Sequence, residues 1–233
     1  MDKFTRKELK ADKFAEEVSH SIEFFTTHRR QSIIYGAAAL ALILAIAGGY
    51  YYRQSQHKAR QEALAQALRV HEAVVGPGNP DDPRASFPTR EAKDLAQRQA
   101  FLLVTTRYPS SNEGATAHFH LGHLASEKGN LAEAEKHFRE AAKRGDKVIA
   151  STANYSLAQV LVGMHKYQDA EKLLRDLIAN PTILVSKEQA TIELARLIAR
   201  TKPAEARKML EPMQQDKNQV VVRNAAAALG ELP

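Results

Sequence analysis

Three histidines stand close together in the sequence and invite a metal-binding interpretation. They are His118, His120 and His123. Residues two apart on a helix point about 200° away from each other, so His118 and His120 diverge. His120 and His123 would lie near one another, but the chain has no Cys to complete a site, and no nearby Asp or Glu clearly joins them. We therefore expect ordinary helix histidines, with no metal and no cofactor.

Other patterns that carry catalysis are missing from the sequence as well. It holds no glycine-rich phosphate loop, no G-x-S-x-G nucleophile motif and no zinc-binding His pair. Asp81 and Asp82 lie in a proline-rich stretch that lacks the spacing of a calcium loop. We predict that the chain is not an enzyme and has no small-molecule substrate.

The composition favours an all-α protein. Only 6% of the 233 residues are aromatic, and the chain is rich in Ala, Leu, Glu, Lys, Gln and Arg, which are good helix formers. The formal net charge is +6, but acidic and basic residues alternate along most of the chain. A nucleic-acid binder would instead show a basic stripe or cluster. Nucleic-acid binding is therefore disfavoured.

One segment near the start is apolar enough to cross a membrane. The stretch from Ile33 to Tyr52 contains no charged residue, and as a helix it would span about 30 Å, the thickness of the hydrocarbon core of a bilayer. Tyr35 and Tyr50 lie near the expected membrane interfaces. We predict a single transmembrane helix over residues 32–52. A cleaved signal peptide is the alternative, because Ala45-Ile46-Ala47 resembles a cleavage site, but the leading segment is mixed in charge and is not short and basic.

A line of small residues follows one face of this helix. Ala37, Ala41, Ala45 and Gly49 recur every four residues, and such lines let a second membrane helix approach closely. Because the segment is rich in alanine, the line also arises easily without a partner. The charges leave the orientation nearly open, since similar numbers of basic residues lie within about 20 residues of each end.

The sequence of residues 1–31 predicts an amphipathic helical tail. Thr5 to Glu8 fits a capping box. The apolar residues of the tail recur at helical spacing: Phe14, Val18, Ile22 and Phe25. Such a helix lies on a membrane or on a partner, or packs on itself in a dimer. Its polar face is acidic as well as basic, which favours a protein partner over anionic lipid.

Two further helices are expected after the membrane segment. Residues 53–75 continue as a helix, residues 76–88 form a proline-rich loop, and residues 89–107 form the next helix. In this last helix we expect buried apolar residues at Leu95, Phe101, Leu102 and Leu103.

The rest of the chain repeats itself with spacings of 36 and 37 residues. In each repeat a Leu and a small residue are followed by an alanine and then by large apolar residues. The first repeat has Leu121, Gly122, Ala134, Phe138 and Ala141, the second has Leu157, Ala158, Ala170, Leu174 and Leu177, and the third has Leu194, Ala195, Ala206, Leu210 and Met213. Small residues at these places permit close crossing of two antiparallel helices. The pattern resembles the tetratricopeptide repeat, whose usual period is about 34.

We therefore predict a tetratricopeptide-like solenoid of helical hairpins over residues 53–233. Its units lie near residues 53–110, 112–146, 149–182 and 186–216, and a capping helix covers residues 218–232. The predicted fold class is all-α, with an N-terminal amphipathic helix, a single transmembrane helix and then the repeats.

Repeats of this type present a concave groove lined by the first helix of each unit. A mixture of aromatic, amide and charged side chains there suits an extended peptide or an exposed apolar chain. Mapping the inward-facing positions predicts a groove lined by Phe119, His123, Glu127, Tyr155, Gln159, Val162, Gln189, Ile192, Arg196 and Arg200. The alternative is that these residues form a solvated inner surface, while partners bind the convex side or an end.

The whole arrangement resembles the ancillary SecYEG translocon subunit family, the YfgM-like tetratricopeptide-repeat membrane proteins. The resemblance runs from about Arg29 to the end of the chain, and it is carried by the apolar span, the small-residue helix Ala59–Ala73 and the repeat positions. It implies a bacterial inner-membrane protein with a cytoplasmic N-terminus and a periplasmic repeat domain. The implied partners are the Sec translocon and a membrane-anchored periplasmic chaperone, and the implied function is to pass secretory chains to folding factors.

A scaffold for the assembly of an envelope or membrane-associated complex is the alternative function. Such a scaffold would bind one folded partner and would be indifferent to unfolded chains.

Overall fold

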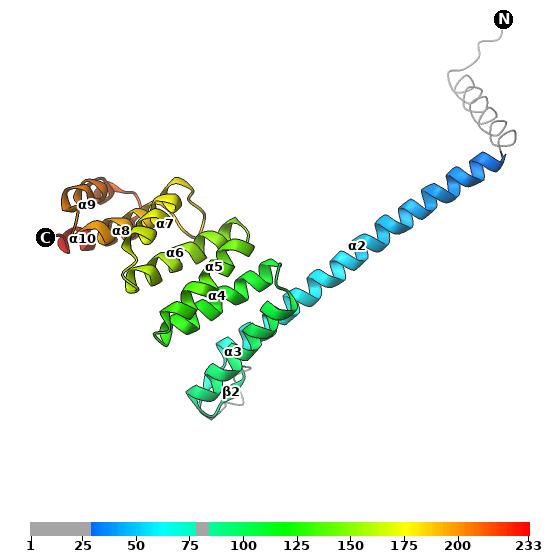
Figure 1. Ribbon diagram of the computed structural model, residues 1–233, viewed down its shortest axis with the longest axis horizontal. Helices are drawn as coiled ribbons and strands as arrows, with labels where there is room; N and C mark the ends of the chain where they lie inside the picture. The colour runs from blue at the N-terminus through cyan, green and yellow to red at the C-terminus, as the bar shows by residue number, and fades with distance from the viewer. Residues whose placement is uncertain (1–28, 78–83) are drawn as a thin grey trace, which may run out of the picture. The chain divides into compact units, whose positions relative to one another are not determined.

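The computed structural model describes residues 29–77 and 84–233 (Figure 1). The chain divides into two compact units, Met1–His57 and Lys58–Pro233. The predicted amphipathic tail, with its capping box at Thr5 to Glu8, lies outside the described residues. The described secondary structure is almost entirely helical, which confirms the predicted all-α fold with one long apolar helix followed by helical hairpins.

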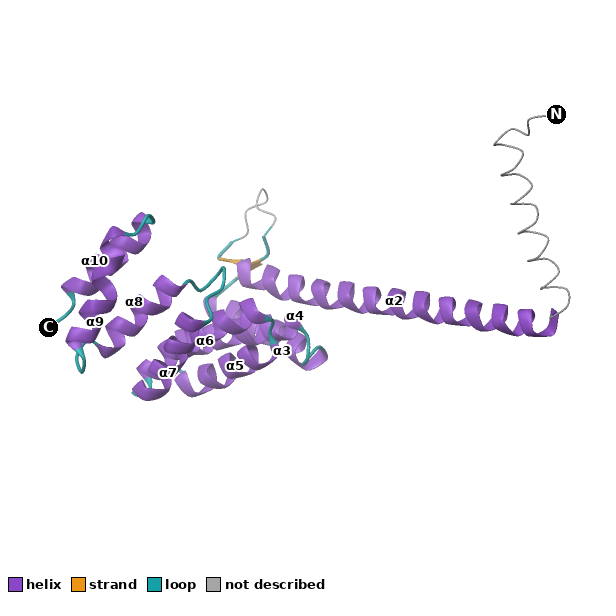
Figure 2. Ribbon diagram, turned by 90° about the horizontal axis from the view of Figure 1, so that it is seen from above, coloured by secondary structure: helices purple, strands orange, loops and turns teal. Residues whose placement is uncertain are grey.

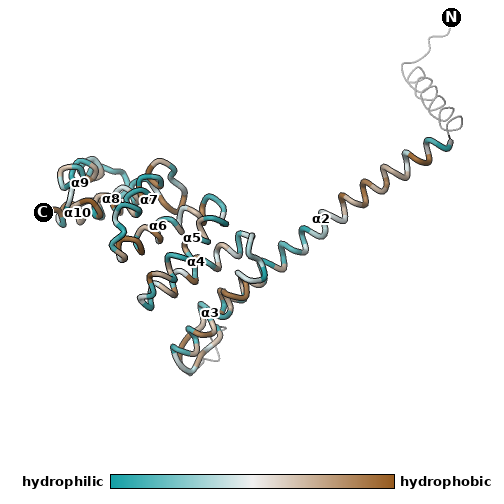
Figure 3. Tube along the Cα trace, viewed as in Figure 1, coloured by the Kyte–Doolittle hydropathy of each residue, from teal (hydrophilic) through white to brown (hydrophobic). Residues whose placement is uncertain are grey.

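The helix α2 (Arg29–Glu72) contains the predicted membrane span. Its residues from Ile33 to Tyr52 are exposed, and Figure 3 shows the apolar residues gathered along this part of the helix. Among the helices of the described ranges, it is the one that is long and apolar enough to cross a membrane. A continuous exposed apolar surface of this kind marks a site of contact with lipid or with another apolar surface.

The second unit begins within α2 and continues through short helices. A two-residue parallel pairing of β1 (Val74–Val75) with β2 (Ser86–Phe87), not expected from the sequence, joins the two ends of the connection from α2 to α3. The elements that follow are α3 (Arg90–Arg107), α4 (Asn112–Glu127), α5 (Leu131–Arg144), α6 (Lys147–Gly163), α7 (Tyr167–Ala179), α8 (Lys187–Ile198), α9 (Pro203–Leu210), the 3-10 helix η1 (Glu211–Gln215) and α10 (Gln219–Gly230). From α3 on, each helix packs on the next one (Figure 2).

Side-chain caps set where many of these helices begin. A side-chain oxygen at the residue before the first turn accepts a backbone N–H that has no partner inside the helix. The residues that do this are Thr89, Ser111, Asn130, Asp146, Ser186 and Asn218.

The last turns of α2 pack against α3 and α4. Ala67, Phe101 and Leu121 are the centre of this small core. The expectation that Leu95 and Leu103 are buried was wrong, because they are 59% and 60% exposed. Leu103 lies on the opposite side of α3 from Phe101, since a residue two positions along a helix is turned by about 200°, and Leu95, six positions before Phe101, is turned away from it by about 120°. Burying the Phe101 ring therefore turns Leu103 outward.

The hairpins pack closely because small residues stand where their helices cross. A Cβ atom at Gly122 would lie 2.7 Å from Cε1 of Phe138, so only glycine leaves room for that ring. Alanines occupy the corresponding crossings, and these are fully buried: Ala134, Ala158, Ala170, Ala195 and Ala206. The hydrophobic core consequently runs as one cluster from α4 to α10.

The turns inside two of the hairpins use the same backbone conformation. Gly129, between α4 and α5, has a φ of 73°, and His165, between α6 and α7, has a φ of 60°. These residues stand 36 positions apart, which is the spacing of the repeats. Glycine adopts this left-handed conformation freely, whereas a side chain makes it less favourable.

An ion pair between neighbouring hairpins recurs with the same spacing. Glu135 on α5 lies 2.7 Å from Lys166, the residue before α7. Thirty-six positions later, Glu171 on α7 lies 3.0 Å from Lys202, the residue before α9. Partly exposed pairs of this kind add only about 0.2–1 kcal/mol each. Their regular recurrence nevertheless shows that each unit sits on the next in the same register.

Hydrogen bonds align the starts of the first helices of the units. The Asn112 side chain, at the start of α4, donates to the Asp146 carboxylate and accepts from the Asp146 backbone N–H, with both distances 2.8 Å. Ser151 Oγ on α6 lies 2.7 Å from Thr182 Oγ1 in the loop before α8. These contacts hold α4, α6 and the loop before α8 in fixed positions, and these elements carry the predicted groove.

The crossing at Gly122 leads to a stability prediction. Gly122→Ala should lower the free energy of unfolding by about 1–3 kcal/mol, because the buried Phe138 ring must shift to admit the new methyl group. Gly230→Ala is the matched control, since no atom lies within 4 Å of a Cβ placed there. Urea unfolding followed by circular dichroism would measure both variants. Equal stability of the two variants would contradict the proposed packing constraint.

Candidate protein-binding groove

The residues predicted to line the groove lie on the first helices of successive units. Phe119, His123 and Glu127 lie on α4, Tyr155, Gln159 and Val162 on α6, and Gln189, Ile192 and Arg196 on α8, with Arg200 shortly after the end of α8. Five of them line one of two pockets: Phe119 lines the smaller pocket, and Tyr155, Gln189, Ile192 and Arg196 line the larger. Glu127, Gln159 and Arg200 are exposed and line neither of these pockets.

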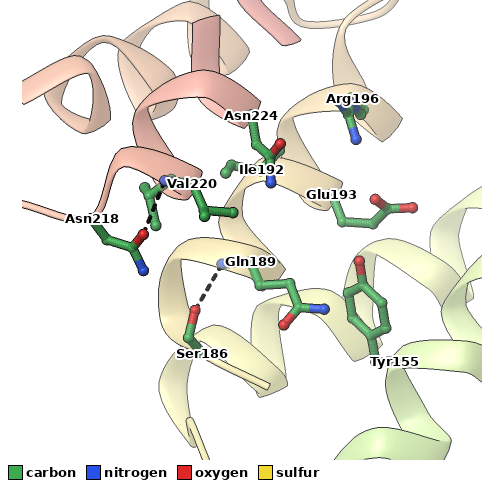
Figure 4. A pocket seen from close by; sticks show the side chains of 10 residues that line it. Tyr155, Ser186, Gln189, Ile192, Glu193, Arg196, Asn218, Val220 and Asn224 are labelled. Atoms are coloured by element: carbon green, nitrogen blue, oxygen red, sulfur yellow. Dashed lines mark hydrogen bonds between the residues drawn. The ribbon is translucent and has the colours of Figure 1, made fainter. Parts of the chain in front are cut away.

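The larger pocket lies between α6, α8 and α10 and has a volume of about 400 Å³ (Figure 4). Its lining combines a tyrosine, amides, a hydroxyl, one acidic and one basic group and three aliphatic side chains. The lining residues are Tyr155, Ser186, Gln189, Ile192, Glu193, Arg196, Asn218, Val220, Val221 and Asn224. We call this the polar pocket. Its side chains offer both hydrogen-bond donors and acceptors beside an apolar surface.

Two helix caps fix one side of the polar pocket. Ser186 Oγ accepts the backbone N–H of Gln189 at 3.1 Å, and Asn218 Oδ1 accepts the backbone N–H of Val220 at 2.9 Å. Both bonds are drawn in Figure 4. Capping leaves the Asn218 side-chain NH₂ available as a donor.

Tyr155 stands at the point where α6 meets α8. Burial raises the pKa of its hydroxyl, and the nearby Glu193 carboxylate raises it further, while an interaction with the Gln189 side chain acts in the opposite direction. Figure 4 shows the Gln189 side chain reaching toward the Tyr155 ring. The hydroxyl is therefore neutral at physiological pH and serves as a hydrogen-bonding group.

The basic group of the polar pocket already has a partner. Arg196 Nε lies 3.3 Å from Glu231, which follows α10. Arg196 and Glu193 have opposite charges on the same helix, so the pocket carries no strong net charge. It is consequently unsuited to select a highly charged ligand.

The smaller pocket lies between α4, α6 and the loop before α8, and its volume is about 190 Å³. Its lining residues are Thr116, Phe119, His120, Ile149, Thr152 and Leu184. We call this the apolar pocket. The two threonine hydroxyls bond to backbone carbonyls of their own helices, at 2.9 Å in each case, which leaves mainly their methyl groups to face the pocket.

A cluster of histidine and phenylalanine rings lies beneath the apolar pocket. His120 stacks on Phe101 with the ring centres 4.7 Å apart, and His71 lies 5.3 Å from His120. Burial, with the neighbouring His71 and His123 as smaller causes, lowers the pKa of His120 to about 4. His120 is therefore neutral at physiological pH. It behaves as an aromatic wall of the pocket, not as a charged group.

His118 faces away from this cluster, as the helical spacing predicts. Its Nδ1 lies 3.0 Å from Nδ1 of His137 on α5. One of these two ring nitrogens donates to the other, and His137 Nε2 faces the Glu133 carboxylate at 3.7 Å. Burial lowers the pKa of His118 to about 4, with His137 as the next cause. Within residues 29–77 and 84–233, no three His, Asp or Glu side chains come together in a way that could hold a metal ion.

The proposed contact line in the membrane segment lies in the other unit. Ala37, Ala41, Ala45 and Gly49 are all exposed on α2, and nothing lies within 4 Å of a Cβ placed at Gly49. Contact with a second membrane helix through this line stays a prediction.

The sequence profile of the tetratricopeptide repeat-like domain family matches residues 24–181, which is more than half of the chain. The chain belongs to this family of tetratricopeptide repeat-like domain proteins. Domains of this kind are generally non-catalytic and bind other proteins, so the repeat domain is a protein–protein interaction module. No curated protein and no solved structure matches the chain.

The buried histidines lead to a prediction about pH. The folded chain resists protonation of His118 and His120, whereas the unfolded chain binds these protons near pH 6.5. The part of the free energy of unfolding that these two neutral histidines contribute is therefore fully present above pH 6.5 and is lost as the pH falls toward 4. The urea midpoint should drop between pH 7 and 5, a range above that in which the ion-paired glutamates titrate.

His120→Phe tests this assignment because it keeps an aromatic ring on Phe101 but cannot be protonated. The drop in urea midpoint between pH 7 and 5 should become smaller in this variant. An unchanged drop would assign the pH dependence to other groups.

Proposed function

We propose that this chain is an ancillary factor of the Sec translocon that passes emerging secretory chains to periplasmic chaperones. In this proposal residues 32–52 anchor it in a bacterial inner membrane, with the N-terminus in the cytoplasm and the repeat domain in the periplasm. The likeness of the arrangement to the YfgM-like subunits of the translocon supports this assignment.

The proposal rests on the helix α2, which contains both the predicted membrane span and residues of the repeat-domain core. Residues 33–52 of α2 are apolar and exposed, and the same helix supplies Ala67 and its neighbours to the core of the repeat domain. Only residues 53–57 of the chain separate the end of the predicted span from the second unit. The repeat domain is thus tethered to the anchor by a short stretch of sequence.

Attachment of this kind supplies a physical mechanism. Two sites joined by a short connection meet at an effective concentration on the order of millimolar, so even weak binding to an emerging chain is populated. The pockets on α4, α6, α8 and α10 provide the surface for that binding.

The first test is the location of the repeat domain in cells. Protease should digest it in cells whose outer envelope is opened while the inner membrane remains intact. The measurement is loss of the full-length band with a cytoplasmic protein as an intactness control. Protection until lysis would place the repeats in the cytoplasm and overturn the proposal.

The second test separates client handling from scaffolding. The translocon and a membrane-anchored chaperone should co-purify with the chain in mild detergent, and the purified chain should bind an unfolded secretory protein. Recovery of one folded partner, with no binding of unfolded chains, would favour an assembly scaffold instead.

A further inference from the structure

The apolar pocket has the dimensions of a single side chain. Its volume of about 190 Å³ is below the 300–1,000 Å³ of typical small-molecule sites. None of the six lining residues carries a formal charge, since His120 is neutral under physiological conditions. A large aliphatic or aromatic side chain matches both the size and the lack of charge.

The loop that forms one wall of this pocket is held in place. Thr182 N–H donates to the Val185 carbonyl at 2.9 Å, and Thr182 Oγ1 accepts the Val185 N–H at 3.2 Å while contacting Ser151 on α6. Val185 is buried. The same loop leaves Ile183 and Leu184 exposed to 90% and 59%. Their exposure is thus a consequence of a fixed loop conformation.

The apolar and polar pockets are neighbours on α6. Ile149 and Thr152 line the apolar pocket and Tyr155 lines the polar pocket, so about 5–9 Å separates them along the helix axis. This distance corresponds to two or three residues of an extended peptide.

The polar pocket complements a peptide main chain. Each peptide unit needs one acceptor and one donor, and the amides of Gln189, Asn218 and Asn224 provide both kinds of group. In the described part of the chain, the Asn224 amide makes no hydrogen bond with another residue. The opposite charges of Glu193 and Arg196 again favour an uncharged segment.

We propose that the two pockets together bind an extended, uncharged segment of a non-native polypeptide. The apolar pocket receives one large apolar side chain, and the main chain two or three residues away lies in the polar pocket. This inference rests on the proposed function, because it names what the repeat domain recognises in a client. Such segments are buried in folded proteins and exposed in emerging ones.

The test uses the full-length chain in phospholipid nanodiscs and two fluorescent peptides. Both peptides consist of Ser, Thr, Asn and Gln, and one has a single central Phe that the other replaces by Ser. The Phe peptide should bind at least about tenfold more tightly, as expected from burial of an aromatic side chain. Equal affinities for the two peptides would overturn the proposal.

Two matched pairs of variants locate the binding. Leu184→Ser should lower the affinity for the Phe peptide severalfold. Ile183→Ser, in the same loop but lining neither pocket, should leave this affinity unchanged. Thr152→Leu should fill the apolar pocket and abolish the preference for Phe. Thr106→Leu is its control, because the exposed Thr106 hydroxyl makes the same bond to a helix carbonyl, at 2.8 Å. Equal effects within either pair would contradict the assignment.

A second probe separates this inference from the proposed function. A reduced and carboxymethylated, permanently unfolded protein should bind the wild-type chain and lose affinity in the Leu184→Ser variant. Undiminished binding to Leu184→Ser would keep the proposed function and overturn the pockets as its site. No binding to the wild type would overturn both. Cross-linking of two copies of the chain through Leu184 would assign the pocket to self-association and overturn the inference.

Discussion

The close approach of helices at small residues is the constraint on which the repeat domain depends. Gly122 lies directly beneath the Phe138 ring, and buried alanines stand at the corresponding crossings of the later hairpins. Larger side chains there would force the helices apart, and a packed interior tolerates such changes poorly. The recurring contact between Glu135 and Lys166, and between Glu171 and Lys202, follows from the same register. The first helices of the units are thereby held side by side, and the pockets lie on the surface that they form.

The pockets arise from differences between the repeats and not from their common pattern. The polar pocket needs α10, which follows the last hairpin, and the apolar pocket needs the loop with Leu184, which replaces a tight turn between α7 and α8. A regular array would present similar surfaces at every unit. Here the departures from regularity give neighbouring sites with different chemistry. The half-buried histidines of α4, His118 and His120, remain neutral at physiological pH.

The periodic positions could be predicted from the sequence because the close crossings leave a repeated signature of Leu, Gly or Ala and large apolar residues. Tyr155, Gln189, Ile192 and Arg196 could be placed near one another for the same reason. Leu95 and Leu103 were misplaced, because an apolar residue alone does not reveal which side of a helix is buried. Asn218, Asn224 and Leu184 could not be identified, since they reach the pockets through tertiary packing that no local spacing encodes. The pairing of His118 with His137 likewise depends on how α4 and α5 cross.

The central claim is that partners bind the surface formed by α6, α8 and α10, and not the side formed by the second helices. Photo-crosslinking in living cells tests it most directly, with a benzophenone amino acid placed at Gln189 in one strain and at the exposed Lys172 of α7 in another. The account predicts crosslinks to other proteins from position 189 and none above background from position 172. Crosslinks from position 172 alone would contradict it.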